Sequence, residues 1–233
     1  ESVQNRMSLI ATSGIVEQLR SIKDSEELVL LEKAVEIADT AFEEVLPSIK
    51  LGDTEADVAW RLEQVMRVLG AEKVSFDTIV GVGPNGALPH HLASDDPILE
   101  GVPIVIDMGA LYRGYCSDLT RTICIGQPDE TFPKVYDIVL GAQETACATA
   151  HAGMTSGEVD ALARNIISDA GYGEQFGHAL GHGVGLEVHE FPGLGPNAAA
   201  MMQDGMVFTI EPGIYLPGWG GVRIEDTVVM EQG

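Results

Sequence analysis

The chain has 233 residues, 45% of them hydrophobic and 21% charged, which is typical of a globular protein that can bury one full-sized core. Its formal net charge of −23 argues against a nucleic-acid partner, because phosphates would be repelled rather than neutralised. The sequence has no apolar run long enough to span a membrane and no secretory signal in residues 1–6, so we expect a cytoplasmic protein whose cysteines stay reduced.

Four segments combine apolar residues at helical spacing with start and stop signals: residues 24–46, 54–70, 134–150 and 155–171. In the first, Asp24 and Glu27 have the spacing of a capping box, and Pro47 ends the helix because it cannot continue the hydrogen-bonding pattern. In the second and the fourth, a threonine starts the helix and a glycine stops it. Strand-like segments lie between and after these helices, which indicates an α+β protein.

The second and fourth helices resemble copies of each other. Residues 52–58 and 153–159 share the pattern Gly-x-Thr-x-x-acid-Val at an offset of 101 positions, and strand-like segments follow both. Helix caps of this kind are common, so chance similarity is an alternative. We favour an internal duplication, in which two helix–helix–strand halves enclose a shared cleft.

The first half contains a predicted hairpin with two carboxylates. Strand sequences at residues 102–110 and 115–124 flank a four-residue turn segment. A turn at the middle of that segment places Asp107 directly opposite Asp118.

The second half contains a comparable hairpin. Residues 206–211 and 222–229 flank a loop rich in proline and glycine. With the loop centred on Gly218, Glu211 lies opposite Glu225.

Carboxylates placed opposite each other on one sheet face repel, and such pairs destabilise a sheet. Asp107 and Glu211 each close an apolar run, so both should be partly buried, where an unpaired charge is costly. A shared proton, a basic side chain or a metal ion can compensate. Arg121 and Arg223 could serve one carboxylate pair each, so structural ion pairs remain an alternative.

His182 favours metal ions over structural ion pairs. It lies in the segment Gly181-His182-Gly183-Val184-Gly185, whose glycines exclude a stable helix and allow close backbone approach. Four carboxylates and one imidazole form a ligand set rich in hard oxygen atoms, which suits Mn²⁺ or a similar octahedral ion. Two divalent ions would balance the four negative charges.

These motifs resemble the family of pita-bread metallopeptidases that contains aminopeptidase P and Xaa-Pro dipeptidase (prolidase). The resemblance rests on residues 106–110, 117–121, 181–190, 211–213 and 223–226, and it runs from about Arg20 to the last residue. It implies a pita-bread fold with two pseudo-symmetric helix–helix–strand halves around a curved sheet. It also implies that residues 1–233 are a single catalytic domain, in which residues 1–20 are a linker from an absent N-terminal domain.

The resemblance further implies a ligand set for two divalent metal ions. The ions are expected to be Mn²⁺, with Co²⁺, Zn²⁺ or Fe²⁺ as alternatives, and Asp118 and Glu225 would bridge them. The ligands implied are Asp107, Asp118, His182, Glu211 and Glu225.

The implied activity is hydrolysis of the N-terminal Xaa-Pro bond of dipeptides or longer peptides by a hydroxide that bridges the two ions. Glu211 would take the proton of the water, and His189 would stabilise the tetrahedral intermediate. His90 would contact the substrate, and Arg223 would steady the ligand shell. His91 stands where the family commonly has tyrosine, and it has no implied role. A homodimer is left open.

The sequence also permits alternatives to this interpretation. Residues 81–86 fit the Gly-x-Gly-x-x-Gly pattern of a dinucleotide site, but no helical pattern follows them, so a turn that leads to His90 is the better account. Other possible functions on the same fold are a methionine-type aminopeptidase, a metal-dependent lyase and a non-catalytic peptide-binding module.

Overall fold

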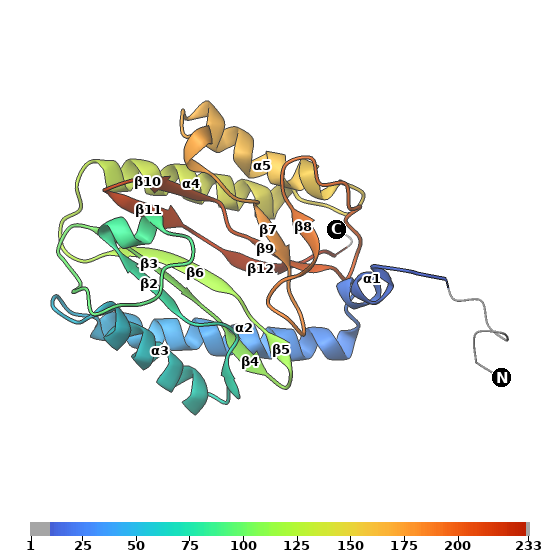
Figure 1. Cartoon of the computed structure of the whole chain (residues 1–233), viewed down its shortest axis with the longest axis horizontal. Coiled ribbons are helices and arrows are strands. Elements are labelled where there is room, and N and C mark those ends of the chain that lie inside the picture. Colours follow the sequence, from blue (N-terminus) through green and yellow to red (C-terminus); the bar gives the residue numbers. More distant parts are fainter. Residues whose placement is uncertain (1–9, 232–233) are drawn as a thin grey trace.

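The computed structural model describes residues 10–231 (Figure 1). All four predicted helices are present, and a short helix that was not predicted precedes them within the segment expected to be a linker. Their bounds are α1 Ile15–Ser21, α2 Ser25–Val45, α3 Glu55–Val68, α4 Thr131–Thr149 and α5 Ser156–Asp169. Among the described residues, no helix is both long enough and apolar enough to cross a membrane. The linker and single-domain interpretation stays a prediction.

The helix starts follow from their caps. The Asp24 side chain accepts the amides of Glu26 and Glu27, and the Glu27 carboxylate accepts the Asp24 amide at 2.9 Å, which confirms the predicted capping box. Thr54 and Thr155 begin α3 and α5 with the same reciprocal pattern. Each of these two helices has 14 residues. They therefore match along their whole length at the predicted offset.

The strands form small antiparallel sheets that belong to one half of the chain or the other. The first half holds the sheets β2-β3-β6 and β1-β4-β5, and the second half holds β12-β9-β7-β8 and β10-β11. The bounds are β1 Lys73–Val74, β2 Ile79–Val82, β3 Pro103–Met108, β4 Ala110–Tyr112, β5 Tyr115–Cys116, β6 Leu119–Cys124, β7 Gly181–Gly183, β8 Glu190–Leu194, β9 Val207–Ile210, β10 Gly213–Leu216, β11 Gly220–Arg223 and β12 Asp226–Val229.

Each half has its own apolar core. In the first half, α2 and α3 pack on the sheets with Ile37, Leu62 and Ile104 among the buried residues. In the second half, α4 and α5 pack on their sheets around residues such as Ile167 and Phe208. Figure 1 shows α2 and α3 along one side of the molecule, α4 and α5 along the opposite side, and the strands between them. The predicted two-half architecture is confirmed.

Hydrogen bonds across a central seam join the two halves. The Thr122 hydroxyl donates to the Arg223 carbonyl at 2.8 Å and accepts the Arg223 amide at 3.0 Å. Two residues along each segment, Thr120 forms a β-bridge with Glu225. Residues of β6 and of the segment between β11 and β12 therefore stand side by side, which brings the acidic residues of both halves together.

The predicted register of the first hairpin is wrong by two positions. The structure pairs Asp107 with Thr120, not with Asp118. The reason is the turn: Arg113 and Gly114 have φ values of 47° and 87°, so a two-residue turn with both central residues at positive φ closes the hairpin later than expected. A shift of two residues preserves the face, so Asp118 stays on the same side as Asp107.

The predicted register of the second hairpin is confirmed. Gly218 is its centre, because Leu216 pairs with Gly220 and, further out, Ile210 pairs with Asp226. Residues 81–86 also behave as expected, because β2 leads into a 3₁₀ helix, η3 Gly83–Ala87, and not into an α-helix.

We expect Gly114→Ala to lower the free energy of unfolding by about 1 kcal/mol, because the left-handed conformation disfavours any residue with a Cβ. The site has open space around it, so no steric clash contributes. Gly141→Ala in α4 is a matched control that also meets open space, and it should be stabilising because alanine favours the helix. Urea denaturation of both variants tests this. Equal effects of the two substitutions would contradict the turn assignment.

Candidate metal centre and active site

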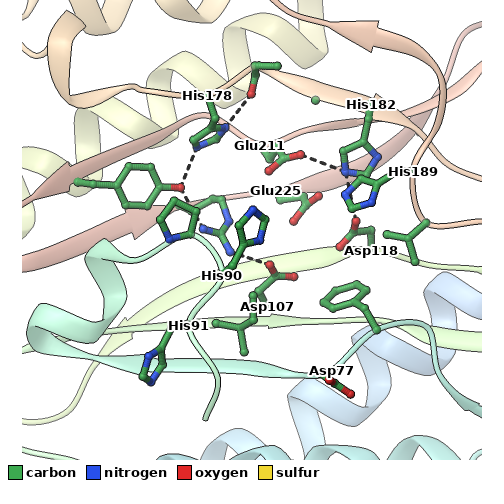
Figure 2. Close-up of a pocket in the computed structure, with 18 of the residues that line it drawn as sticks. Asp77, His90, His91, Asp107, Asp118, His178, His182, His189, Glu211 and Glu225 are labelled. Atoms are coloured by element: carbon green, nitrogen blue, oxygen red, sulfur yellow. Dashed lines mark hydrogen bonds and ion pairs between the residues drawn. The ribbon is translucent and has the colours of Figure 1, made fainter. Parts of the chain in front are cut away.

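All eight side chains proposed for the site line one cavity of about 500 Å³ (Figure 2). They come from both halves of the chain. The first half contributes the loop after η3, β3 and the residue before β6, and the second half contributes β7, the residue before β8, the residue after β9, the end of β11 and the residue before β12. These side chains are His90, Asp107, Asp118, His182, His189, Glu211, Arg223 and Glu225. The structure thus brings the proposed residues together, and their individual roles stay predictions.

Glu211 and Glu225 lie in the break between two strand pairs of the second hairpin, β9–β12 and β10–β11. The Glu211 amide donates to the Leu180 carbonyl at 2.8 Å, which ties it to the strand that continues to His182. The Glu225 amide donates to the Thr120 carbonyl at 3.1 Å, which ties it to the first half. The Glu225 side chain also accepts the Thr120 hydroxyl at 2.5 Å. Each glutamate is therefore held by a neighbour that carries part of the site.

His182 stands among the carboxylates. Its Nε2 lies 3.3 Å from Glu211 Oε1 and 3.5 Å from Asp118 Oδ2. Ligand atoms of Asp118, His182 and Glu225 all lie within 4.8 Å of one another, so these three residues could hold one metal ion. Gly181 allows the backbone beside His182 to lie close to β9, because a Cβ at position 181 would lie 2.0 Å from the Thr209 carbonyl oxygen.

One arginine, and not two, compensates the cluster. The buried Arg223 donates to Asp107 Oδ2 at 2.6 Å and to the Thr120 hydroxyl at 3.1 Å. Arg121 instead pairs with Asp226 at 2.6 Å, outside the set of proposed ligands. The alternative in which each arginine neutralises one carboxylate pair is therefore wrong for Arg121.

Two buried oxygens of the cluster lack partners. Asp107 Oδ1 and Glu225 Oε1 have no hydrogen-bond donor among the described residues. A buried carboxylate oxygen without a donor or cation is strongly destabilising. Oxygen atoms in this state fit a divalent cation, and the donor set of hard oxygens with one imidazole fits Mn²⁺.

Burial and mutual repulsion raise the pKa values of three acids of the site. Burial, followed by the charges of Glu225 and Asp107, raises the pKa of Asp118 well above its usual range. Burial, followed by Glu211 and Asp107, does the same to the pKa of Glu225. Burial also raises the pKa of Asp107, against the opposing effect of Arg223. Without cations, protons must therefore relieve the repulsion.

The pKa values of Glu211 and His189 are lowered instead. Burial would raise the pKa of Glu211, but the hydrogen bond and the charge of His182 outweigh it, so the pKa falls below its usual value. Burial and the nearby His182 lower the pKa of His189, whose ring centroid lies 4.3 Å from that of His182. At neutral pH, Glu211 is thus an ionised acceptor and His189 a neutral imidazole with one N–H.

The loop that carries His189 is tied to the N-terminal side of the described chain. Glu190 accepts the Glu187 amide at 3.0 Å, and its buried carboxylate pairs with Lys23 at 3.3 Å and with Arg20 at the end of α1. Lys23 is almost fully buried as well. α1 therefore contributes directly to the order of this loop.

His178 and Tyr215 also line the cavity, although neither was predicted from the sequence. His178 Nδ1 lies 2.7 Å from the Ala179 carbonyl, which can only accept, so this nitrogen carries the proton. Burial lowers the pKa of His178, so its Nε2 is free to accept the Tyr215 hydroxyl at 2.8 Å. Tyr215 in turn accepts Arg223 at 3.0 Å. The available signals were Gly177 before His178, as at His182, and the place of Tyr215 in the strand that follows Glu211.

Comparisons with known proteins agree with this geometry. The model of metallopeptidase family M24 matches residues 29–232. The Xaa-Pro dipeptidase of Pyrococcus horikoshii is 50% identical over 216 residues, which cover 93% of this chain and 62% of that protein. The solved prolidase from Pyrococcus furiosus has a TM-score of 0.92 at 50% identity, and the match covers 94% of this chain and 65% of that one.

A second solved structure is named for a different activity. The X-Pro aminopeptidase from Thermotoga maritima has a TM-score of 0.91 at 49% identity, and the match covers 94% of this chain and 62% of that one. The chain thus spans about three fifths of the length of the curated relatives it matches. The structural likeness confirms the predicted pita-bread fold.

We expect metal-free protein to lose thermal stability as the pH rises above about 5, where carboxyls of ordinary or lowered pKa are already ionised. Asp118 and Glu225 bind protons more tightly in the folded state than in the unfolded chain. Their contribution is complete below the ordinary carboxyl pKa of about 4 and is lost as the pH rises through the elevated values. Asp118→Asn should flatten this dependence, whereas Asp95→Asn at an exposed position should not. Melting curves across the pH range test it, and identical slopes for both variants would refute it.

We also expect metal-free protein to bind close to two Mn²⁺ ions per chain and to become more stable. An ion that binds only the folded state stabilises it by about 2.7 kcal/mol at a free concentration of 100 Kd. Asp118→Asn should bind fewer ions and show a smaller rise in melting temperature. Elemental analysis after desalting provides the count, and fewer than about 0.2 ions per chain would be incompatible with the proposed site.

Proposed function

The chain belongs to metallopeptidase family M24, and from this premise we propose that it is the metal-dependent part of an enzyme that hydrolyses Xaa-Pro dipeptides. The observation that carries the proposal is the buried acidic cluster, in which Asp107 and Glu225 each keep one oxygen without a donor. The names of the relatives, Xaa-Pro dipeptidase and prolidase, support proline in the second position of the substrate. The relatives are named for dipeptidase and for aminopeptidase activities. We propose a dipeptide substrate because the relatives that are 50% identical to this chain over their matched residues are named Xaa-Pro dipeptidases.

The proposed ligands of the ions are Asp107, Asp118, His182, Glu211 and Glu225. Divalent ions held there would supply Lewis-acid polarisation of the scissile carbonyl and would lower the pKa of a bound water. Mn²⁺ is our first choice because the ligand set is dominated by carboxylate oxygens. Arg223 fixes Asp107 through its 2.6 Å hydrogen bond and leaves the other oxygen of that carboxylate available.

Glu211 is the proposed carrier of the proton. Its pKa lies below its usual value, so the carboxylate is ionised and can accept a proton from the attacking water. It then returns the proton to the leaving nitrogen, which must become an amine when the peptide bond breaks. The Thr209 hydroxyl, which donates to Glu211 Oε1 at 3.1 Å, helps to orient the carboxylate for this transfer.

His189 and His90 are the proposed contacts to the substrate. The neutral His189 ring can donate its N–H to the oxygen on which negative charge develops during attack. His90 lines the cavity from the loop after η3, and in Figure 2 it lies close to Asp107. From that position it can contact the carbonyl side of a bound peptide.

Proline recognition must depend on shape, because the nitrogen of an Xaa-Pro bond carries no hydrogen and cannot donate to the protein. The cavity wall offers apolar side chains for the ring and for the first residue: Phe76, Ile79, Leu92 and Val188.

The three cysteines are free, as expected for the cytoplasmic location that we propose.

We expect Mn²⁺-loaded protein to hydrolyse Met-Pro with a kcat/KM at least about tenfold higher than that for Met-Ala, because the apolar wall complements the ring. His189→Ala should lower kcat by about 10² to 10³ while the metal content stays constant, which rules out a contaminating peptidase. Product release is followed by chromatography. Faster cleavage of Met-Ala would refute proline specificity, and a wild-type rate in His189→Ala would refute the role of that histidine.

A further inference from the structure

Glu55 is a fully buried carboxylate outside the metal cluster, at the first position of α3. Its Oε1 accepts the Val82 amide at 2.8 Å and the Asn85 side chain at 2.9 Å. Its Oε2 accepts both the amide and the hydroxyl of Ser94, at 3.0 and 2.7 Å. The fifth hydrogen bond comes from His91 Nε2 at 2.6 Å, which is the shortest of the set.

These contacts tie down the loop that carries His90. The loop leaves η3 at Leu88, whose amide donates to the Asn85 carbonyl at 3.0 Å. It ends where the Ser94 and Asp96 carbonyls accept the first amides of α3, both at 3.0 Å. Both ends of the loop are therefore attached to regular structure.

Between those ends, the ring of His91 is the side-chain anchor. Within residues 89–93 of the described chain, the recorded hydrogen bonds are the His91 amide to the Leu88 carbonyl and the His91 ring to Glu55. His90 and Leu92, on either side, are exposed. Figure 2 shows His90 near the carboxylates of the site and His91 pointing away from them. The position of His90 thus depends on how its neighbour is held.

The charge of Glu55 is compensated by donors alone. Burial would raise the pKa of this carboxyl, but the hydrogen bonds from Asn85, His91, Val82 and Ser94 outweigh burial and lower it. The carboxylate is therefore ionised at neutral pH and can only accept, so His91 Nε2 must carry the proton. Charge-assisted hydrogen bonds of this kind are stronger than neutral ones, which suits them to fixing a loop.

The second half of the chain uses a comparable device. Asp160 in α5 accepts the Leu180 amide at 3.0 Å and binds Arg164 at 2.6 Å. Arg164 donates in turn to the carbonyls of Phe176 at 3.0 Å and His178 at 2.7 Å. In both halves, then, a buried carboxylate of the corresponding helix holds the segment that presents a histidine to the cavity. The recurrence favours a functional reason for the arrangement.

We propose that Glu55 and His91 form a positioning clamp that sets the place of His90 in the cavity, an inference that rests on the proposed function. We assign His91 a positioning role, because its ring, although part of the cavity wall, is hydrogen-bonded to Glu55. Small displacements of a group that contacts the reacting atoms are costly in rate, so a clamp at the residue next to His90 affects turnover through it.

The test compares variants of His91 with and without His90. His91→Ala leaves Glu55 with four donors, so the fold should persist, and we expect kcat/KM for Met-Pro to fall about tenfold. His91→Gln restores an N–H donor and should retain kcat/KM within about threefold of wild type. In the His90→Ala background, adding His91→Ala should change kcat/KM by less than about twofold, because the clamp then has nothing to position. Bound Mn²⁺ should be constant throughout.

Asp53→Asn is the matched control. It removes the Asp53–Arg61 ion pair of 2.5 Å beside the same end of α3 but touches no residue of the His90 loop. It should lower the melting temperature without changing kcat/KM. The clamp is refuted if His91→Ala has the same effect with and without His90, if His91→Ala behaves as wild type, or if His91→Ala loses Mn²⁺.

Amide hydrogen exchange separates the clamp from the proposed function. If the wild type cleaves no Xaa-Pro dipeptide, the proposed function fails, and the clamp is then judged by exchange alone. Peptides that cover residues 88–94 should exchange faster in His91→Ala than in the wild type, whereas Asp53→Asn should leave them unchanged. Equal exchange in wild type and His91→Ala would overturn the clamp.

Discussion

The crowding of four carboxylates in an apolar setting is the constraint on which the rest of this structure depends. Asp118 and Glu225 are buried, Arg223 provides one opposing charge through Asp107, and two carboxylate oxygens have no donor among the described residues. Such an arrangement is unfavourable by itself. The arrangement is explained if the site binds cations, because their binding would offset the free-energy cost of bringing the acids together.

The two-half architecture explains how one chain produces such crowding. Each half is stabilised by its own apolar core, so neither half depends on the acidic cluster for its packing. The seam at Thr120 and Thr122 then aligns a carboxylate pair of the first half with one of the second. Strong local cores thus support a locally unstable centre, as is common where function requires strain.

Much of this organisation was readable in the sequence, and the failures have definite physical causes. The caps at Asp24, Thr54 and Thr155 were predictable because they rest on contacts three residues apart. The predicted register of the first hairpin was wrong because Arg113 adopts a positive φ. Arginine rarely does so, and the residue type therefore gave no sign of this turn. The role of Glu55 could not be inferred, because its five hydrogen bonds come from four residues in three segments that only the fold brings together. The short helix α1 was not predicted because its seven residues are fewer than the roughly eleven or more over which a helical pattern can be recognised.

The link between Arg20, Lys23 and Glu190 changes where the functional unit should be considered to begin. The family model matches the chain only from residue 29, yet the loop of His189 is fastened to Arg20 and Lys23, which precede that match. Removing residues up to 23 would leave Glu190 buried without either cationic partner. The part of the chain that sets the geometry of the cavity therefore begins before the matched residues, and shortened versions of the chain must retain α1.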